Sequence, residues 1–213
     1  MAGCCDPRGC DRMFDDRFAQ RMAARYRKKG LDKTARRMVA LLTENGVRGA
    51  TVLEIGGGVG EIGLELLRGG AATVTNLELS PNYQREAAAL AAEAGLTGRT
   101  MHRLVDITAD PAAVEPADIV VLHRVVCCYP DYARLLGVAA DHARRQLVFS
   151  FPPRNLASRA FVATQNTLLR LGDREFRSFA HPPSAMLAVL ADHGMRPAET
   201  HRGPVWQVAV AGR

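Results

Sequence analysis

The start of the chain contains two stretches whose apolar side chains recur at helical spacing. In residues 15–27, Phe18, Met22 and Tyr26 follow one another at intervals of four, so they share one face of a predicted helix. A second predicted helix is capped by Asp32 and ends at an Asn-Gly pair. Each helix is therefore expected to turn one apolar face toward a larger core.

From residue 51 onward, the period of the apolar residues alternates between that of strands and that of helices. Short runs rich in β-branched residues predict strands over residues 51–55, 73–77, 101–105, 119–122 and 146–151. Helical spacing predicts helices over residues 61–67, 84–93, 132–144, 158–171 and 183–193. Two closing stretches, 196–201 and 205–211, would complete a seven-stranded sheet with a terminal hairpin. Strands that alternate with helices imply an α/β fold, with a mostly parallel sheet and helices on both faces.

The length of the chain sets its domain organisation. Its 213 residues, 47% of them apolar, suffice for one full-sized core. We therefore expect a core domain over residues 50–213 and an N-terminal segment, residues 1–49, whose basic helices form a lid. No apolar run approaches the roughly 18 residues that a membrane span requires. The first ten residues carry cysteines and charges instead of the apolar core of a secretory signal, so we expect a cytoplasmic protein.

Positive charge is concentrated in the N-terminal segment. Residues 8–37 contain 11 Lys and Arg against 4 Asp and Glu, whereas the whole chain has a net charge of +6. Such a segment either presents a solvated helix face or attracts an anionic small molecule, a membrane surface or nucleic acid. Nucleic acid is not favoured, because no aromatic ladder for base stacking accompanies the charges.

A glycine-rich turn between the first predicted strand and the next helix is the strongest chemical signal. Gly56, Gly58 and Gly60 stand at alternate positions of the run EIGGGVG. Glycine permits positive φ there and lets backbone amides approach a ligand. The acidic residue Glu54 precedes the turn, and Glu78 closes the second predicted strand 22 residues after Gly56. This offset suits a carboxylate that hydrogen-bonds the ribose hydroxyls of a nucleoside ligand.

Two classes of ligand use such a ribose-binding carboxylate. A dinucleotide places its pyrophosphate at the helix N-terminus within a G-x-G-x-x-G pattern. Here the loop reads G-G-G-V-G and is flanked by Glu54 and Glu61. Their negative charge is unfavourable beside a pyrophosphate but suits a ligand that carries an ammonium and a sulfonium. The loop therefore favours S-adenosylmethionine, and a nicotinamide-dependent oxidoreductase is an alternative.

These motifs resemble those of the class I S-adenosylmethionine-dependent methyltransferases, whose sheet is Rossmann-like. The resemblance extends over roughly residues 52–151. It implies transfer of a methyl group from S-adenosylmethionine to a small molecule, which the basic lid suggests is anionic or aromatic. It also implies that Asp106 meets the adenine amino group. The donor would be bound by Glu54, Gly56, Gly58, Gly60, Glu78, Leu79, Asp106 and Ile107.

A narrower similarity is to the magnesium-protoporphyrin O-methyltransferases. It rests on residues 148–154 (VFSFPPR), the helix predicted after them, and residues 179–182 (FAHP). Cys128-Tyr129 stands where these enzymes tend to have His-Tyr, which removes one catalytic imidazole. The acceptor therefore stays open at this point.

Methyl transfer from a sulfonium is an in-line displacement, for which an enzyme supplies proximity, alignment and, for some acceptors, a base. A carboxylate acceptor needs no base, whereas a phenol, amine or thiol needs one. His123, Tyr129 and His181 are the candidate catalytic residues, because each is titratable and is expected near the strand ends. Each of them could instead be a packed structural residue.

The cysteines are the most unusual feature of the composition. Their odd number and vicinal clustering do not suggest an extracellular disulfide framework: Cys4, Cys5, Cys10, Cys127 and Cys128. If the N-terminal segment folds over the strand ends, three or four thiolates could bind a soft metal such as zinc. Buried cysteine is also an ordinary small apolar residue. A second alternative is therefore a non-enzymatic module that senses metals or thiols, or binds a partner through its basic helix.

Overall fold

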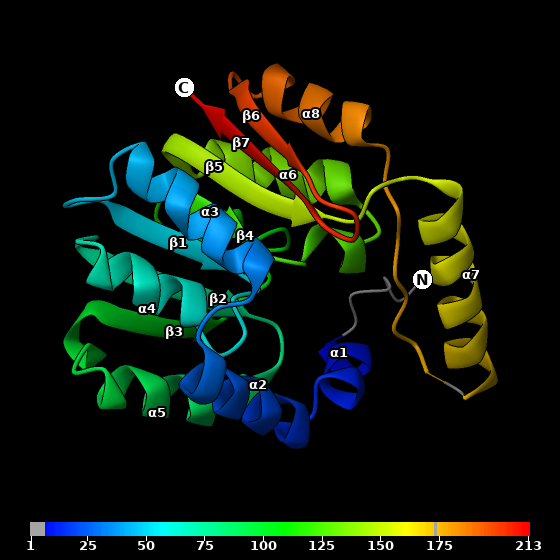
Figure 1. The fold of residues 1–213 in the computed structure, drawn as a ribbon, viewed down its shortest axis with the longest axis horizontal. Helices are drawn as coiled ribbons and strands as arrows, with labels where there is room; N and C mark the ends of the chain where they lie inside the picture. Colours follow the sequence, from blue (N-terminus) through cyan, green and yellow to red (C-terminus); the bar gives the residue numbers. More distant parts are fainter. Residues whose placement is uncertain (1–6, 173) are drawn as a thin grey trace.

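The computed structural model describes residues 7–172 and 174–213, which form an open sheet flanked by helices (Figure 1). The strands are β1 (Thr51–Ile55), β2 (Thr73–Glu78), β3 (Thr100–Leu104), β4 (Ala117–Leu122), β5 (Ala143–Phe151), β6 (Arg196–Arg202) and β7 (Gln207–Gly212). The helices are α1 (Pro7–Met13), α2 (Asp16–Lys29), α3 (Lys33–Glu44), α4 (Glu61–Arg68), α5 (Gln84–Glu93), α6 (Tyr132–Asp141), α7 (Leu156–Leu171) and α8 (Pro183–Asp192). A 3₁₀ turn, η4 (Val126–Cys128), follows β4.

The sheet has the strand order β3-β2-β1-β4-β5-β7-β6. The first five strands in this order are parallel, and β7 is antiparallel to both β5 and β6. The predicted seven-stranded, mostly parallel sheet with a terminal hairpin is therefore confirmed. After β3 the chain returns to β4, on the other side of β1, which creates a switch point. In open α/β sheets, ligands bind outside the carboxyl ends of the strands at such a point.

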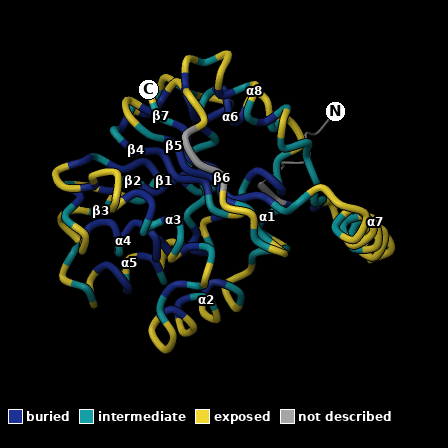
Figure 2. Tube along the Cα trace, turned by 45° about the horizontal axis from the view of Figure 1, so that its top comes forward, coloured by how far each residue is buried: buried dark blue, intermediate teal, exposed yellow. Residues whose placement is uncertain are grey.

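Apolar side chains of the central strands enter two layers, one on each face of the sheet. Val52 and Val121 belong to the layer formed with α3 and α4. Leu53 and Val120 belong to the layer formed with α6 and α8. Neighbouring residues of a strand point to opposite faces, so adjacent apolar residues serve both layers. The central strands are consequently buried along most of their length (Figure 2).

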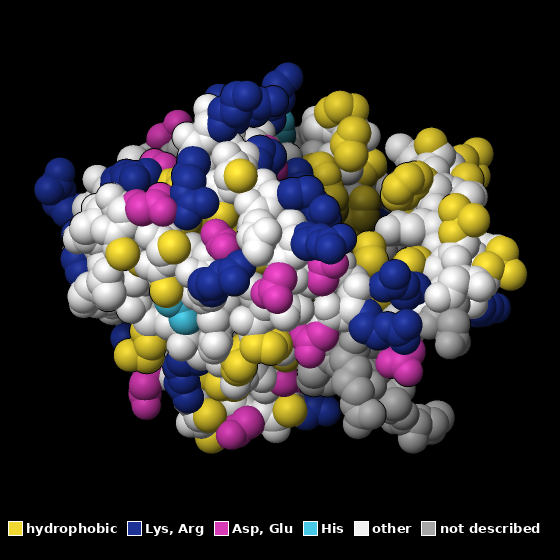
Figure 3. All heavy atoms as spheres, turned by 90° about the horizontal axis from the view of Figure 1, so that it is seen from below, with side chains coloured by type: hydrophobic (Ala, Val, Ile, Leu, Met, Phe, Trp, Pro, Cys, Tyr) yellow, Lys and Arg dark blue, Asp and Glu magenta, His cyan; other side chains and the backbone are white. Residues whose placement is uncertain are grey.

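The N-terminal helices α2 and α3 are present as predicted, and Asp32 caps α3. Helix α2 is attached to the helices that cover the sheet. The Tyr26 hydroxyl donates a 2.6 Å hydrogen bond to Glu65 on α4, and Arg27 lies 2.7 Å from the Glu93 carboxylate on α5. Over the face seen from below, Lys and Arg side chains lie among Asp and Glu side chains (Figure 3). The basic residues of this segment are thus partly neutralised by acidic partners.

Two predicted helix boundaries differ from the structure, and one helix was missed. The helix predicted over residues 132–144 ends at Asp141, because Ala143 already belongs to β5 and pairs with β4. Helix α7 begins before residue 158, because the Asn155 side chain accepts a backbone hydrogen bond and caps it. Helix α1 was not predicted at all.

Helix α7 stands away from the body of the fold (Figure 2). It has no buried side chain, and its large apolar residues Leu156, Phe161, Leu168 and Leu171 are exposed. This arm therefore adds little to the core. Across residues 7–172 and 174–213, no helix combines the length and the apolar character needed to cross a membrane.

Candidate functional site

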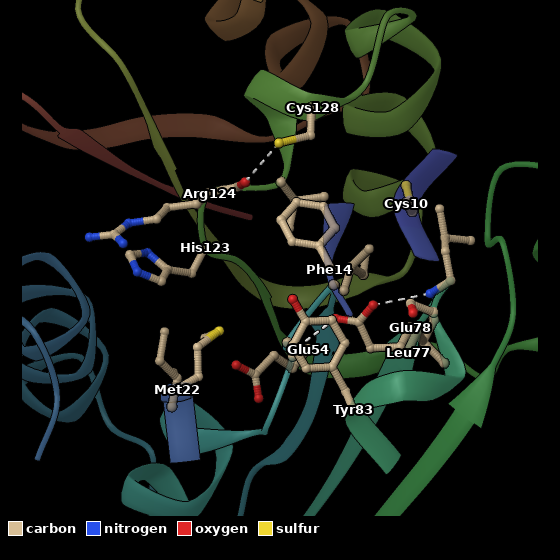
Figure 4. Close-up of a pocket in the computed structure, with 18 of the residues that line it drawn as sticks. Cys10, Phe14, Met22, Glu54, Leu77, Glu78, Tyr83, His123, Arg124 and Cys128 are labelled. Carbon is tan, nitrogen blue, oxygen red and sulfur yellow. Dashed lines mark hydrogen bonds between the residues drawn. The ribbon is translucent and has the colours of Figure 1, made fainter. Parts of the chain in front are cut away.

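A cavity of about 430 Å³ lies at the carboxyl ends of β1, β2 and β4. This is the switch point of the sheet, and the volume is that of a small-molecule site. The N-terminal segment contributes part of the wall through Cys10, Phe14, Phe18 and Met22. Figure 4 shows His123 and Arg124 on one side of this cavity and Glu78 on the other. The N-terminal segment thus forms part of the cavity wall.

The glycine-rich loop has two separate requirements for glycine. Three of its residues have a left-handed backbone, with φ of 64° at Gly56, 59° at Gly58 and 77° at Gly60. Gly57 has no positive φ, but a Cβ there would lie 2.6 Å from Cγ and Cδ of Glu54. The loop therefore passes so close to this carboxyl group that only hydrogen fits between them.

Glu78 ends β2 and is held by the loop. Its carboxylate accepts a hydrogen bond from the Gly58 amide at 2.5 Å and another from the Leu79 amide at 3.1 Å. Burial raises the pKa of Glu78 to about 7, and the hydrogen bonds to its carboxylate oppose that increase. The carboxylate thus has a fixed orientation at the cavity wall, as a group that binds ribose hydroxyls requires.

Glu54 is buried beneath the same loop. It accepts a 3.1 Å hydrogen bond from the Gly63 amide, and a Cβ at Gly63 would lie 2.9 Å from the accepting oxygen. Burial raises the pKa of Glu54 to about 8, and the nearby Glu61 contributes to the increase. The prediction from sequence missed Gly63, although a glycine inside the helix after the loop was a visible signal.

Asp106 and Ile107 line the cavity after β3. The Asp106 carboxylate accepts hydrogen bonds from the Thr108 amide at 2.9 Å and the Thr108 hydroxyl at 2.8 Å. The Thr108 hydroxyl is also hydrogen-bonded to the hydroxyl of Tyr129, another cavity residue. The Tyr129 hydroxyl is therefore connected to the Asp106 carboxylate through the Thr108 hydroxyl.

His123 lies at the end of β4 with a partner at each ring nitrogen. Nδ1 is 3.0 Å from the buried Ser150 hydroxyl, and Nε2 is 3.5 Å from Asp32 of the lid. Burial lowers the pKa of His123, and Asp32 only partly offsets this. The imidazole is therefore neutral near pH 7 and connects the lid with the sheet.

Arg124 has the one positive φ among the non-glycine residues that the structure describes, at 60°. Such a backbone persists only where its surroundings enforce it. The Arg124 amide donates to Ser150 at 2.9 Å, its guanidinium lies 2.7 Å from Asp32, and it stacks 4.9 Å from the centre of the Trp206 ring. These contacts fix a cation at the cavity wall.

Two of the predicted site residues do not line the cavity. Gly60 instead supplies the left-handed turn before α4. His181 places Nε2 2.9 Å from the backbone oxygen of Tyr129, and its ring packs between Phe179 and Tyr132. It therefore supports the turn that carries Tyr129. The remaining predicted residues line the cavity: Glu54, Gly56, Gly58, Glu78, Leu79, Asp106, Ile107, His123 and Tyr129.

The predicted thiol cluster is only partly visible. The sulfur atoms of Cys127 and Cys128 are 3.6 Å apart, and Cys128 and Cys10 both line the cavity. Cys4 and Cys5 lie outside the described residues. Among residues that the structure does describe, no group of three or more His, Cys, Asp or Glu side chains is arranged to hold a metal ion.

Carboxyl groups outnumber guanidinium groups at the cavity wall. Arg25 and Arg124 are the guanidinium groups at its wall, whereas the carboxyl groups there are Asp32, Glu54, Glu61, Glu78 and Asp106. Burial raises the pKa of Glu54 and of Glu78, and a ligand that carries positive charge would stabilise the ionised forms of both.

The open seven-stranded sheet, with a glycine loop after β1 and an acid at the end of β2, matches the Rossmann-like methyltransferase fold. Residues 52–146 match the family model of the methyltransferase domain. The predicted resemblance to S-adenosylmethionine-dependent methyltransferases is therefore confirmed over this segment. No curated protein matches the chain with significant sequence similarity.

Solved structures show the same fold at low sequence identity. The magnesium protoporphyrin IX methyltransferase of Synechocystis PCC 6803 with bound SAH is 21% identical, with a TM-score of 0.72 over 95% of this chain and 99% of that one. An O-methyltransferase family protein of Burkholderia thailandensis is 19% identical, with a TM-score of 0.72 over 94% of this chain and 61% of that one. An O-methyltransferase family 2 protein of Planctomyces limnophilus, in complex with apigenin, is 17% identical, with a TM-score of 0.62 over 86% and 62%.

Proposed function

We propose that this protein transfers the methyl group of S-adenosylmethionine to a small-molecule acceptor. The observation that carries the proposal is the carboxylate of Glu78, oriented by the Gly58 and Leu79 amides at the wall of an acidic cavity. The donor carries an ammonium and a sulfonium, so a cavity rich in carboxyl groups fits it. Structures of the same fold, one of them with bound SAH, support this choice.

Different residues bind different parts of this donor. Glu78 binds the ribose hydroxyls, Asp106 and Ile107 meet the adenine, and Glu54 supports the loop from beneath. The backbones of Gly56 and Gly58 approach the donor where a side chain would prevent contact, and Gly60 turns the chain into α4. Leu79 orients Glu78 through its amide.

The acceptor would lie between the end of β4 and the lid. Aromatic rings of Phe14, Phe18 and Tyr83 line this region together with Tyr129, and Arg124 supplies positive charge. This composition supports an anionic or aromatic acceptor. Apigenin and protoporphyrin in the names of structures with this fold are compatible with it.

The donor brings an electrophilic methyl group, so the chain has to align the acceptor, exclude water and remove a proton where one is lost. The Thr108 hydroxyl donates to Asp106, so the Tyr129 hydroxyl donates to Thr108. A proton accepted by Tyr129 can therefore pass along this chain to the Asp106 carboxylate. We assign His123 the role of a neutral group that orients the acceptor wall, and His181 that of positioning Tyr129.

Residues 1–49 would act as the lid over the core domain of residues 50–213. Asp32 connects the two parts, because it caps α3 within the lid and pairs with Arg124 of the core.

The test is calorimetric titration of the purified protein with S-adenosylmethionine, SAH and, separately, NADH. We expect micromolar binding of the first two and a clear loss of affinity in Glu78→Ala. Glu44→Ala, which removes an exposed glutamate outside the cavity, is the matched control and should bind like the original chain. Tight binding of NADH without binding of the methyl donor would instead support a nicotinamide-dependent oxidoreductase.

A further inference from the structure

Glu61 is a buried carboxyl group with an unfilled hydrogen-bonding position. It opens helix α4, its side chain is only 7% exposed, and it lines the cavity. Within the described part of the chain, its Oε2 atom is buried without a hydrogen-bond partner. Burial raises the pKa of Glu61, and the nearby guanidinium of Arg25 opposes the increase. A buried carboxyl oxygen without a hydrogen-bond partner lowers the stability of the folded protein, and a hydrogen-bond donor on a bound ligand would remove this cost.

Arg25 faces the same end of the cavity from lid helix α2. Its guanidinium lies 3.9 Å from Oε1 of Glu61 and 3.9 Å from Oδ2 of Asp32. Both separations are within ion-pair range but exceed hydrogen-bonding distance, so the Arg25 guanidinium donates a hydrogen bond to neither carboxyl group. The guanidinium and the Glu61 carboxyl group therefore present opposite charges side by side at the cavity wall.

A zwitterion is the ligand that matches this pair. An α-amino acid carries an ammonium and a carboxylate on one carbon, and each would meet its opposite charge here. Charge-assisted hydrogen bonds of both kinds are stronger than neutral ones, and the planar guanidinium suits a carboxylate. A ligand with only a positive charge would leave Arg25 unmatched, and a ligand with only a negative charge would leave Glu61 unmatched.

We propose that Glu61 and Arg25 form a clamp for the amino-acid end of the methyl donor. Glu61 accepts hydrogen bonds from the α-ammonium, and Arg25 donates to the α-carboxylate. This inference rests on the proposed function and adds residues outside the glycine loop. Because Arg25 belongs to α2 and Glu61 to α4, the clamp makes lid closure dependent on the amino-acid part of the ligand.

The test compares two ligands that share the adenosine and the thioether. SAH carries the amino-acid end, and 5′-methylthioadenosine lacks it. In Glu61→Gln we expect a roughly 10- to 100-fold loss of SAH affinity, the range for a hydrogen bond to a charged group. In Arg25→Gln, whose side chain is 41% exposed, solvent screening limits the loss to about 3- to 10-fold. Affinity for 5′-methylthioadenosine should stay within about twofold in both variants.

Two controls separate the clamp from a structural role. Arg17→Gln removes another exposed arginine of α2 that does not line the cavity, and it should bind both ligands normally. If Glu61 merely stabilised the start of α4, its variant would lower the melting temperature and weaken both ligands equally, which would overturn the clamp. Arg25→Gln keeps the inference testable if Glu61→Gln fails to fold, because Arg25 lies at the surface.

The outcomes distinguish the clamp from the proposed function. If the original chain binds SAH and both variants keep its full affinity, the clamp is wrong and the methyltransferase proposal stands. If the original chain binds neither ligand, both proposals fail. Selective loss of SAH affinity, with binding of 5′-methylthioadenosine retained, is the result that supports the clamp.

Discussion

The burial of Glu54 leads to a quantitative prediction about stability. Its pKa rises from an ordinary value of 4.5 to about 8 in the folded protein, through burial first and the neighbouring Glu61 second. The unfolded chain therefore ionises this group above about pH 4.5, whereas the folded protein keeps it protonated up to about pH 8. The contribution of Glu54 to stability is complete below pH 4.5 and is lost as the pH rises through 8.

The size of this loss follows from the gap between the two pKa values. At about 1.4 kcal/mol per pH unit, the gap corresponds to an upper limit of roughly 5 kcal/mol. Glu54→Gln removes the ionisation but keeps an oxygen that can accept the Gly63 hydrogen bond. We expect the free energy of unfolding of the original chain to fall by about 2–4 kcal/mol more than that of the variant between pH 5 and pH 9.

Urea unfolding followed by circular dichroism at pH 5, 7 and 9 measures this difference. Glu78 titrates in the same range, with a pKa of about 7, and it does so in both proteins, so its effect cancels in the comparison. Glu44→Gln provides a control for a loss of charge outside the cavity. If the curves of the original chain and of Glu54→Gln run parallel over this range, Glu54 is not held protonated by burial, and the reasoning fails.

Four further outcomes can be measured. Affinity for S-adenosylmethionine should rise between pH 6 and pH 9, and binding should release protons, because the donor favours the ionised forms of Glu54 and Glu78, whose pKa values are raised to about 8 and 7. Calorimetry in buffers of different ionisation enthalpy would detect the released protons. An affinity that does not change with pH would count against this prediction. Gly57→Ala should lower stability by about 1–3 kcal/mol and weaken donor binding, because its Cβ would lie 2.6 Å from Glu54. The control, Gly98→Ala, should leave stability unchanged, because a Cβ there meets nothing within 4 Å. Tyr129→Phe should slow the methylation of a phenol roughly 10²-fold while leaving donor affinity intact, and equal rates would exclude the proton path to Asp106. Asp32→Asn keeps the cap of α3 but weakens the attraction to Arg124, so a thermal scan should show a loss of about 1 kcal/mol or less, since the arginine is 43% exposed.

Local sequence was sufficient wherever one segment determines its own geometry. The glycine run and its flanking acid identified the loop after β1, and the distance to Glu78 identified the end of β2. The cap at Asp32 also followed from sequence, because a capping side chain bonds the backbone two and three residues ahead. Each of these features depends on neighbours along the chain, so no knowledge of packing was required.

Features that depend on distant residues could not be predicted in this way. The approach of Arg25 to Glu61 joins two helices whose relative position is set by packing. His181 was expected near the strand ends, and it lies there, but its ring nitrogen bonds the backbone of Tyr129. The end of α6 was misplaced because strand pairing with β4 decides where helix gives way to β5.

Asp32 interacts electrostatically with residues of the lid, of the sheet and of the cavity wall. Burial alone would raise its pKa, yet the hydrogen bond from His123, the amide of Ala35 and the charge of Arg124 hold that pKa well below the usual range. A carboxylate so stabilised stays ionised at any physiological pH, so it continues to hold Arg124 in its left-handed conformation. Arg25 lies near the same carboxylate, and a ligand carboxylate would compete with Asp32 for it. Through Asp32, the proposed binding of the amino-acid end of the donor would therefore be coupled electrostatically to Arg124 at the acceptor wall.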